Sequence, residues 1–391
     1  MLSTPLSEKR SDADRLYRFK TILIIAFIAG LLLSPNLWLS TRSYPLLPVF
    51  DFLPSPAFPL DHFHFGAILL SLFIALFVRD PRKIILPIAL VIVAIVLDQS
   101  RLQPWTYQYI LMLAAIVLFP RNPSEEQTVL NVLRTIVASI YFWSGLQKLN
   151  GSFFTEVFPW FISLLASLFP QDYFSVFLLL GLIVPLVEMF IGAGLLFPRT
   201  RPIAIGLAWG MAFFVLGNLG PYGHSWNSVV WPWNITIALM ATVLFVNTKE
   251  DYNEIFGWIH RYRFPHTIFA ILCVAPFLYF FNHWDSYPSW SLYSGTIRYG
   301  SLQIGIADWN NVPADIQKFA HEGPTGTYVI DIASWSFQEL NVPPYPEPRI
   351  FKGILRSFCV NGIDDVSLHI TDRLSWFNRE GPQTLSCNEV L

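Results

Sequence analysis

The chain contains a series of apolar runs, several of them long enough to cross a lipid bilayer. One of them, TILIIAFIAGLLL at 21–33, has no charged residue, and a spanning helix needs about 20 mostly apolar residues. Only 13% of the 391 residues are charged and 53% are hydrophobic, whereas a soluble globular chain has roughly 25% charged residues. This composition predicts a polytopic membrane protein. The net charge of -2 gives no indication of a nucleic-acid partner.

The apolar runs predict an all-α polytopic bundle of about nine transmembrane helices, which covers residues 1–285. Their approximate limits are 19–39, 62–78, 83–98, 104–120, 127–147, 172–198, 202–218, 228–247 and 266–284. We expect the first span to be retained, because no small-residue cleavage site follows it. The apolar segment 153–169 is short and contains Glu156 and Pro159, which favours a helix lying at the membrane interface.

Lysine and arginine are distributed unevenly between the loops. If the N-terminus is cytoplasmic, fifteen of them lie in inner segments, and three lie in outer segments before residue 285, namely Arg42, Arg101 and Lys148. Basic loops are retained on the cytoplasmic side of a membrane. We therefore expect a multi-pass protein of the cell inner (plasma) membrane with a cytoplasmic N-terminus. Nine spans then place the C-terminus on the other side.

Polar and turn-forming residues return after residue 285 and predict a small extracytoplasmic α+β domain at 286–391. TYVIDI at 327–332 and VSLHI at 366–370 have strand-like composition. EPRIFKGILRSFCV at 347–360 has apolar residues at helical spacing. Cys359 and Cys387 lie in this domain, where an exported compartment permits a disulfide, and two free thiols are the alternative. The chain has no C-x-x-C, H-E-x-x-H or glycine-rich phosphate loop, so we expect neither a metal nor a nucleotide cofactor.

The fifth predicted span ends in YFWSGLQKLN at 141–150, which places Lys148 at the outer membrane surface. Ser144 and Gly145 allow close helix packing, and Trp143 is one of several aromatic residues that can shield the lysine from water. A desolvated lysine can act as a base near neutral pH. The alternative is a lysine that only extends to the interface.

Two further groups are candidates for acid–base chemistry. Glu188 lies near the middle of the sixth predicted span, where a carboxylate must face the bundle interior and pair or become protonated. His224 lies in GNLGPYGHSWNS at 217–228, a stretch in which glycines and a proline oppose regular helix. We expect His224 on the same side of the membrane as Lys148. A structural pair for Glu188 and a solvated histidine in a capping loop are the alternatives.

Aromatic and polar residues near the predicted outer face are candidates for the lining of a pocket. Such a pocket would suit a flat lipid such as a quinone, and the alternative is an aromatic belt at the membrane interface. The candidates are Tyr107, Tyr109, Trp143, Asn218 and Tyr222.

YFWSGLQKLNGSFF at 141–154 resembles the signature of the vitamin K-dependent γ-carboxylase family, also called the horizontally transferred transmembrane (HTTM) domain. The family pattern, small-Gly-x-x-Lys-Leu-(Asp/Asn), is matched in order by Ser144, Gly145, Lys148, Leu149 and Asn150. PLVEMFIGAGLLFPRTRPIAIGL at 185–207 resembles a later helix of the family. The similarity covers roughly residues 15–300.

The resemblance implies that Lys148 is the base that deprotonates a vitamin K-like hydroquinone. In that family, oxygenation of the quinol drives carboxylation of glutamate in an exported protein or peptide. Two family histidines are replaced here by Trp105 and Val215, and the large domain that holds the protein substrate is replaced by a short one. The resemblance therefore implies quinol chemistry like that of the family's epoxidation and carboxylation reaction. The differences argue against glutamate as the group that is carboxylated.

The leading hypothesis from the sequence is a membrane protein that binds a quinone or other lipophilic ligand in an outward-facing pocket. Lys148 is its candidate base, with Glu188 and His224 as further catalytic candidates. The rival hypothesis is a non-enzymatic membrane anchor or assembly subunit that acts through its C-terminal domain. A transporter is third, since the sequence shows no inverted repeat.

Overall fold

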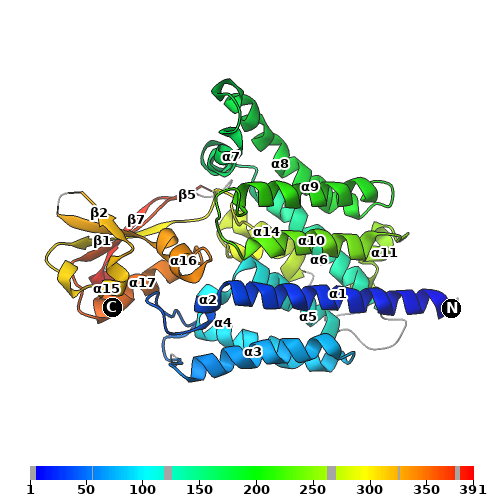
Figure 1. Cartoon of the computed structure of the whole chain (residues 1–391), viewed down its shortest axis with the longest axis horizontal. Coiled ribbons are helices and arrows are strands. Elements are labelled where there is room, and N and C mark those ends of the chain that lie inside the picture. Colours follow the sequence, from blue (N-terminus) through cyan, green and yellow to red (C-terminus); the bar gives the residue numbers. More distant parts are fainter. Residues whose placement is uncertain (1–5, 55, 119–125, 262–269, 325, 375–378) are drawn as a thin grey trace.

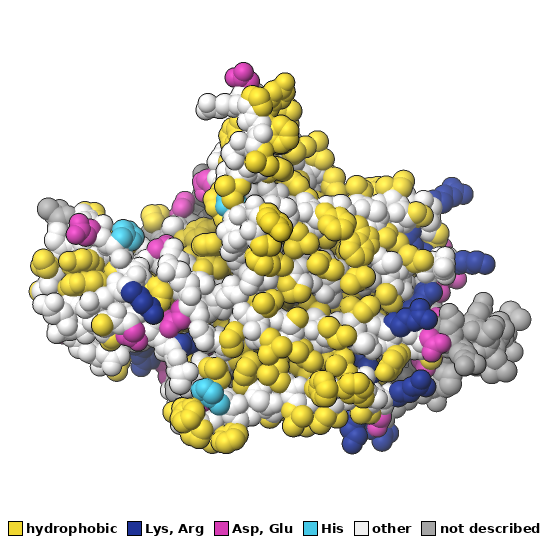
Figure 2. Space-filling view, in the orientation of Figure 1, with side chains coloured by type: hydrophobic (Ala, Val, Ile, Leu, Met, Phe, Trp, Pro, Cys, Tyr) yellow, Lys and Arg dark blue, Asp and Glu magenta, His cyan; other side chains and the backbone are white. Residues whose placement is uncertain are grey.

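The computed structural model describes residues 6–54, 56–118, 126–261, 270–324, 326–374 and 379–391. A helical bundle occupies most of the molecule, and a sheet region lies at one end of it (Figure 1). The N-terminus lies at the opposite end of the bundle. The space-filling view shows lysine and arginine side chains gathered at this N-terminal end (Figure 2).

Five described helices are long and apolar enough to cross a membrane. They are residues 12–33 of α1 (Leu6–Leu33), α3 (Leu60–Phe77), α6 (Glu126–Gln147), 171–195 with α8 (Phe174–Leu195), and α9 (Arg201–Leu219). Shorter apolar helices accompany them, namely α4 (Ile85–Leu97), α5 (Pro104–Leu118), α10 (Val230–Phe245) and 271–281 with α14 (Ala275–Leu278). Helix length and composition thus indicate a multi-pass membrane protein.

The structure supports fewer full-length spans than the nine predicted. The predicted span 83–98 contains a 13-residue α-helix that ends before the extended Asp98, and the described part of the predicted span 104–120 is the 15-residue helix α5, which begins at Pro104 as predicted. A helix of 13 residues rises about 20 Å, which is less than the roughly 30 Å of a hydrocarbon core. Residues 119–120 and 266–269 of the predicted spans lie outside the described residues, as do Arg121 and Arg263 of the loop-charge argument.

Helices near and far in sequence pack side by side in the bundle. α1 contacts α10, α10 contacts α9, and α6 contacts α8. Two arginines cap the C-terminal ends of helices: Arg134 Nε donates to Leu244 O at 2.8 Å, and Arg201 Nε donates to Leu195 O at 2.9 Å. Cationic groups near helix C-termini interact favourably with the helix dipole and its terminal carbonyls.

The C-terminal region contains a five-stranded antiparallel sheet in the order β2–β3–β1–β4–β7, with Leu302 paired opposite Ile330 and Leu368. α16 (Ile332–Leu340) contacts β1 and β3, and α17 (Pro348–Val360) contacts β4. The predicted strands at 327–332 and 366–370 and the predicted helix at 347–360 are confirmed within about a residue at each end. The strands are β1 (Gly300–Gly305), β2 (Ala320–Glu322), β3 (Thr327–Asp331), β4 (Val366–Ile370) and β7 (Gln383–Ser386), with β5 (Arg373–Leu374) and β6 (Arg379–Glu380) as a separate pair.

Cys359 and Cys387 form a disulfide, which resolves the choice that the sequence left open. The bond joins α17 to the short 3-10 turn Cys387–Glu389 after β7. Cys273 is the remaining cysteine, and it packs partly buried against the bundle core.

The sheet region is attached to the bundle by polar contacts. Glu347 accepts hydrogen bonds from the backbone N and the Oγ of Ser286 at 2.8 and 2.7 Å. Arg373 Nη2 donates to Tyr279 O at 2.8 Å, and Arg349 pairs with Asp285. The contacts of Arg373 and Arg349 cross the predicted domain boundary at 285, so the two parts meet in a packed junction, whereas Ser286 lies on the same side of the boundary as Glu347.

Candidate functional site

Helices α6 and α8 approach each other closely at two glycines. A Cβ atom on Gly145 would lie 2.4 Å from the carbonyl oxygen of Pro185, and one on Gly192 would lie 2.5 Å from the carbonyl oxygen of Ala138. Both distances are shorter than a carbon–oxygen contact allows, so this helix separation requires glycine. The predicted close packing at Gly145 is confirmed, and it brings the C-terminal part of α6 against the middle of α8.

This close approach brings together Lys148 and Glu188. Lys148 Nζ lies 2.6 Å from Glu188 Oε2, 2.6 Å from Ser144 Oγ and 3.3 Å from Ser144 O. An ammonium group has three hydrogens, and all three have an acceptor here. The side chains of Lys148 and Glu188 are only 11% and 10% exposed. The prediction that Glu188 faces the bundle interior and pairs is confirmed.

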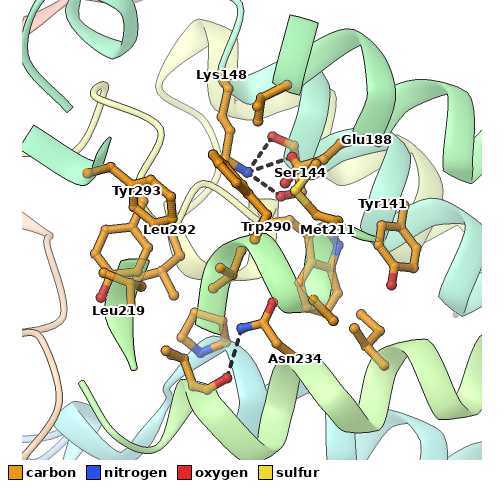
Figure 3. Close-up of a pocket in the computed structure, with 18 of the residues that line it drawn as sticks. Tyr141, Ser144, Lys148, Glu188, Met211, Leu219, Asn234, Trp290, Leu292 and Tyr293 are labelled. Carbon is orange, nitrogen blue, oxygen red and sulfur yellow. Dashed lines mark hydrogen bonds and ion pairs between the residues drawn. The ribbon is translucent and has the colours of Figure 1, made fainter. Parts of the chain in front are cut away.

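The ion pair lies in the wall of a cavity with a volume of about 120 Å³ (Figure 3). Tyr141 and Ser144 share the face of α6 on which Lys148 lies, as a period of 3.6 residues requires. Most other lining side chains are apolar. They come from α7 (Phe158–Ala166), α9, α10 and the segment 290–293, and include Phe158, Phe161, Met211, Leu219, Ile237 and Leu292. The site is therefore an ion pair in the wall of an otherwise apolar cavity.

Asn150 connects the end of the lysine helix to the segment that closes the cavity. Its Nδ2 donates to Gln147 O at 2.8 Å and to Ser294 O at 2.6 Å, while its Oδ1 accepts from Phe153 N at 2.9 Å. Trp290, Leu292 and Tyr293 line the cavity directly before Ser294. The Asn150 side chain thus joins the end of the helix that carries Lys148 to the segment that forms this part of the cavity wall.

Three of the predicted aromatic residues lie outside this cavity. Trp143 projects from a different face of α6, because it is not at a helical repeat from Lys148. Tyr109 is buried with Trp105 and Phe27 on another side of α5. Tyr107 packs its ring against Trp290, with 5.3 Å between ring centroids, and so lies one layer behind the cavity wall.

The residues predicted from 217–228 also lie outside the cavity. α9 continues through Asn218, against the expectation of no regular helix there, and Asn218 Nδ2 donates to Phe214 O at 2.8 Å. Tyr222 is fully exposed. His224 stacks on Trp160 with ring centroids 4.7 Å apart, and its Nε2 lies 3.0 Å from Trp160 O. The structure does not bring His224 to the Lys148–Glu188 pair.

A second hollow, with a volume of about 380 Å³, lies between the bundle and the sheet region. Trp160, Arg298 and Asp331 are among its lining residues, and Val157, Leu292 and Tyr293 line both hollows. The Trp160 side chain therefore faces this groove, whereas Phe158 and Phe161 of the same segment line the cavity beside Lys148.

Sequence reasoning missed several cavity residues. Tyr141 and Ser144 could have been found, since they precede Lys148 by seven and four positions on one helix face. Asn234 could have been found by the same criterion as Glu188, since both are polar side chains within apolar spans. Trp290 and Tyr293 had no such signal, because only the chain path after the last helix brings them to Lys148.

Within the described residues, no group of three or more His, Cys, Asp or Glu side chains is arranged to hold a metal ion. The donor set of the cavity, one ammonium, one carboxylate, hydroxyls and an amide, suits the polar end of an organic molecule. No protein-family model, curated protein or solved structure matches this chain.

Proposed function

We propose that this protein binds a lipophilic, ring-containing molecule in the cavity, with a polar substituent of the ring at the Lys148–Glu188 pair. One observation supports this proposal above the others: a buried ion pair lies in the wall of an otherwise apolar cavity. An ion pair within a membrane bundle is costly and usually marks a functional site. An apolar pocket with a few convergent polar groups is the usual form of a small-molecule site.

The cavity volume of about 120 Å³ limits the ligand. An engineered cavity of about 150 Å³ binds benzene, so this cavity accommodates roughly one ring. Any long tail must leave the cavity. A quinone or hydroquinone with an isoprenoid tail has this shape. It is also the ligand class implied by the resemblance to the vitamin K-dependent γ-carboxylase family.

The ion pair suggests how a proton would move. The Lys148 ammonium has no lone pair, and its hydrogens are directed to Glu188 and Ser144. Within the described residues, Glu188 Oε1 accepts no hydrogen bond. A ligand hydroxyl would donate its proton to this carboxylate, and the resulting oxyanion would pair with the ammonium. In this proposal the base is the Lys148–Glu188 pair rather than the lysine alone.

The orientation follows from the distribution of charge. Lysine and arginine side chains gather at the N-terminal end of the bundle, and the sheet region lies at the other end (Figures 1 and 2). With the basic end in the cytoplasm, the sheet region faces the extracytoplasmic side of the plasma membrane. Trp290 and Tyr293, next to the junction with this region, then place the cavity near that side.

Analysis of co-purified lipids tests the proposal. The wild-type protein is extracted with its lipids and compared with the double variant Lys148→Met/Glu188→Leu, which removes both charges at similar volume. Lys352→Met makes the same change at an exposed position and serves as the control. We expect a quinone or other prenylated ring compound with the wild type and with Lys352→Met, and its loss from the double variant. Equal amounts in all three, or none in any, would contradict the proposal.

The alternative of an assembly subunit is favoured by a different surface. Gln303, Ser367 and His369 form a hydrogen-bonded polar cluster on the face of the sheet opposite buried Leu302 and Leu368. A partner protein that binds there would be lost from pull-downs of a Gln303→Ala/His369→Ala variant and kept by Lys148→Met. Truncation after residue 285 cannot separate the two ideas, because it would also remove Trp290 and Tyr293 from the cavity.

A further inference from the structure

The cavity has a second polar point away from the ion pair. Asn234, in the first turns of α10, lines the cavity together with Lys148 and Glu188. Figure 3 shows Asn234 across the open space from Lys148 and Ser144, with its amide oxygen pointing toward their side. A ring seated between the two walls would present one edge to the ion pair and the opposite edge to Asn234.

A local hydrogen bond fixes which atom Asn234 offers. Its Nδ2 donates to the carbonyl oxygen of Val230 at 2.8 Å. The reverse orientation would direct the amide oxygen against that carbonyl, which has no hydrogen to donate. Within the described part of the chain, no residue donates a hydrogen bond to Asn234 Oδ1. Asn234 therefore presents an acceptor to the cavity.

Apart from Glu188 Oε1 at the ion pair, the other polar atoms of the wall do not duplicate this acceptor. Trp233 Nε1 donates to Gln108 Oε1 at 2.9 Å, and the Tyr293 hydroxyl accepts from Asn227 Nδ2 at 3.1 Å. The hydroxyl of Tyr141 can both donate and accept, so it does not select between ligands. The two walls are thus chemically different. The Lys148–Glu188 pair can accept a proton and hold the resulting anion on one side, and Asn234 supplies a neutral acceptor on the other.

We propose that Asn234 determines ligand specificity, by requiring a hydrogen-bond donor, O–H or N–H, on the ring edge far from the Lys148–Glu188 pair. A ring with a carbonyl or ether oxygen at that edge would set two acceptors against each other. A buried polar group left without a partner costs about 1–3 kcal/mol, which is roughly a tenfold loss of affinity or more. This inference rests on the proposed function and adds a selection rule to it.

The test uses a 1,4-hydroquinone with a short isoprenoid tail and the matching 1,4-benzoquinone. The two probes share one carbon skeleton, and they offer hydroxyl donors or only carbonyl acceptors at the ring edges. Binding to the full chain in nanodiscs is measured by anaerobic equilibrium dialysis, with empty nanodiscs as the partition control. The variants are Asn234→Leu, which removes the acceptor, and Ile235→Val, which trims an exposed side chain of α10 outside the cavity without changing its polarity.

We expect the wild type and Ile235→Val to bind the hydroquinone about tenfold or more tightly than the quinone. Asn234→Leu should lower this ratio severalfold, chiefly by weakening the hydroquinone, and leave the part of the preference that comes from Glu188, while its thermal midpoint stays near that of Ile235→Val. An unchanged ratio in Asn234→Leu would overturn the role of Asn234. Binding that still required Lys148 and Glu188 would then leave the proposed function standing. Failure of the wild type to bind either probe would overturn both.

Discussion

Helices α6 and α8 pack against each other, yet they differ in how many of their residues are buried inside the protein. In the most apolar 18-residue stretch of each helix, 78% of the α6 residues are buried inside the protein, against 22% of those of α8. α8 is nevertheless the more apolar helix. α6 contacts α1, α5, α8 and α10, whereas α8 contacts mainly α6, α7 and α9. The more hydrophobic helix is the peripheral one.

The difference shows that hydropathy in a membrane bundle reflects exposure to lipid more than burial inside the protein. A helix that faces lipid needs apolar side chains, because lipid offers its polar groups no partner. A central helix can carry polar groups that its neighbours satisfy. In α6, Arg134 Nη1 donates to Asn131 Oδ1 at 2.6 Å, and Thr135 Oγ1 donates to Asn131 O at 2.9 Å. Glu188 is the exception on α8, and its partner comes from α6.

Breaking the one ion pair that joins these helices should have the largest effect. Lys148→Met leaves the Glu188 carboxylate buried without its cation, and loss of one partner of a buried pair costs about 3–5 kcal/mol. The double variant Lys148→Met/Glu188→Leu leaves no uncompensated charge and should recover most of that stability. Thermal unfolding in a single detergent measures all three proteins. If the double variant were as unstable as the single one, the pair would not be acting as a compensated charge.

The difference in burial can be tested directly with matched leucines. Leu133 of α6 is fully buried, whereas Leu182 of α8 is 51% exposed. Leu133→Ala should cost about 2–5 kcal/mol by leaving a cavity, and Leu182→Ala should cost clearly less, because lipid can fill the space. Unfolding midpoints of the two variants give the comparison. Equal losses would mean that α8 has a protein partner on its outer face.

The close approach of the two helices should be sensitive to a single methyl group. Gly192→Ala places a Cβ against the backbone of α6 and should cost about 1–3 kcal/mol, as overpacking does. Gly206→Ala on α9 is the control, since a Cβ there meets nothing within 4 Å. Removing a helical glycine at such a site should stabilise by about 0.5–1 kcal/mol. A stabilising Gly192→Ala would show that the helices are farther apart than described.

The sequence was sufficient to predict the parts of the protein that depend on local pattern. Apolar runs identified the helices, strand-like runs and helical spacing identified β3, β4 and α17, and a charge within a span identified Glu188 as inward-facing. These signals are local, because the hydrophobic effect and backbone hydrogen bonding act on each segment wherever it lies. Span length was less predictable, since the predicted spans 83–98 and 228–247 contain α-helices of only 13 and 16 residues.

Only the tertiary structure decided which groups share a site. Lys148 and Glu188 are 40 positions apart, and nothing local pairs them. Two glycines at the crossing of α6 and α8 allow the short helix separation that brings the two side chains together. Tyr109, Asn218, Tyr222 and His224 lie outside the cavity, whereas Asn234, Trp290 and Tyr293 line it. The reason is geometric: which face of each helix turns inward depends on packing against its neighbours, and the sequence of one helix does not contain that information.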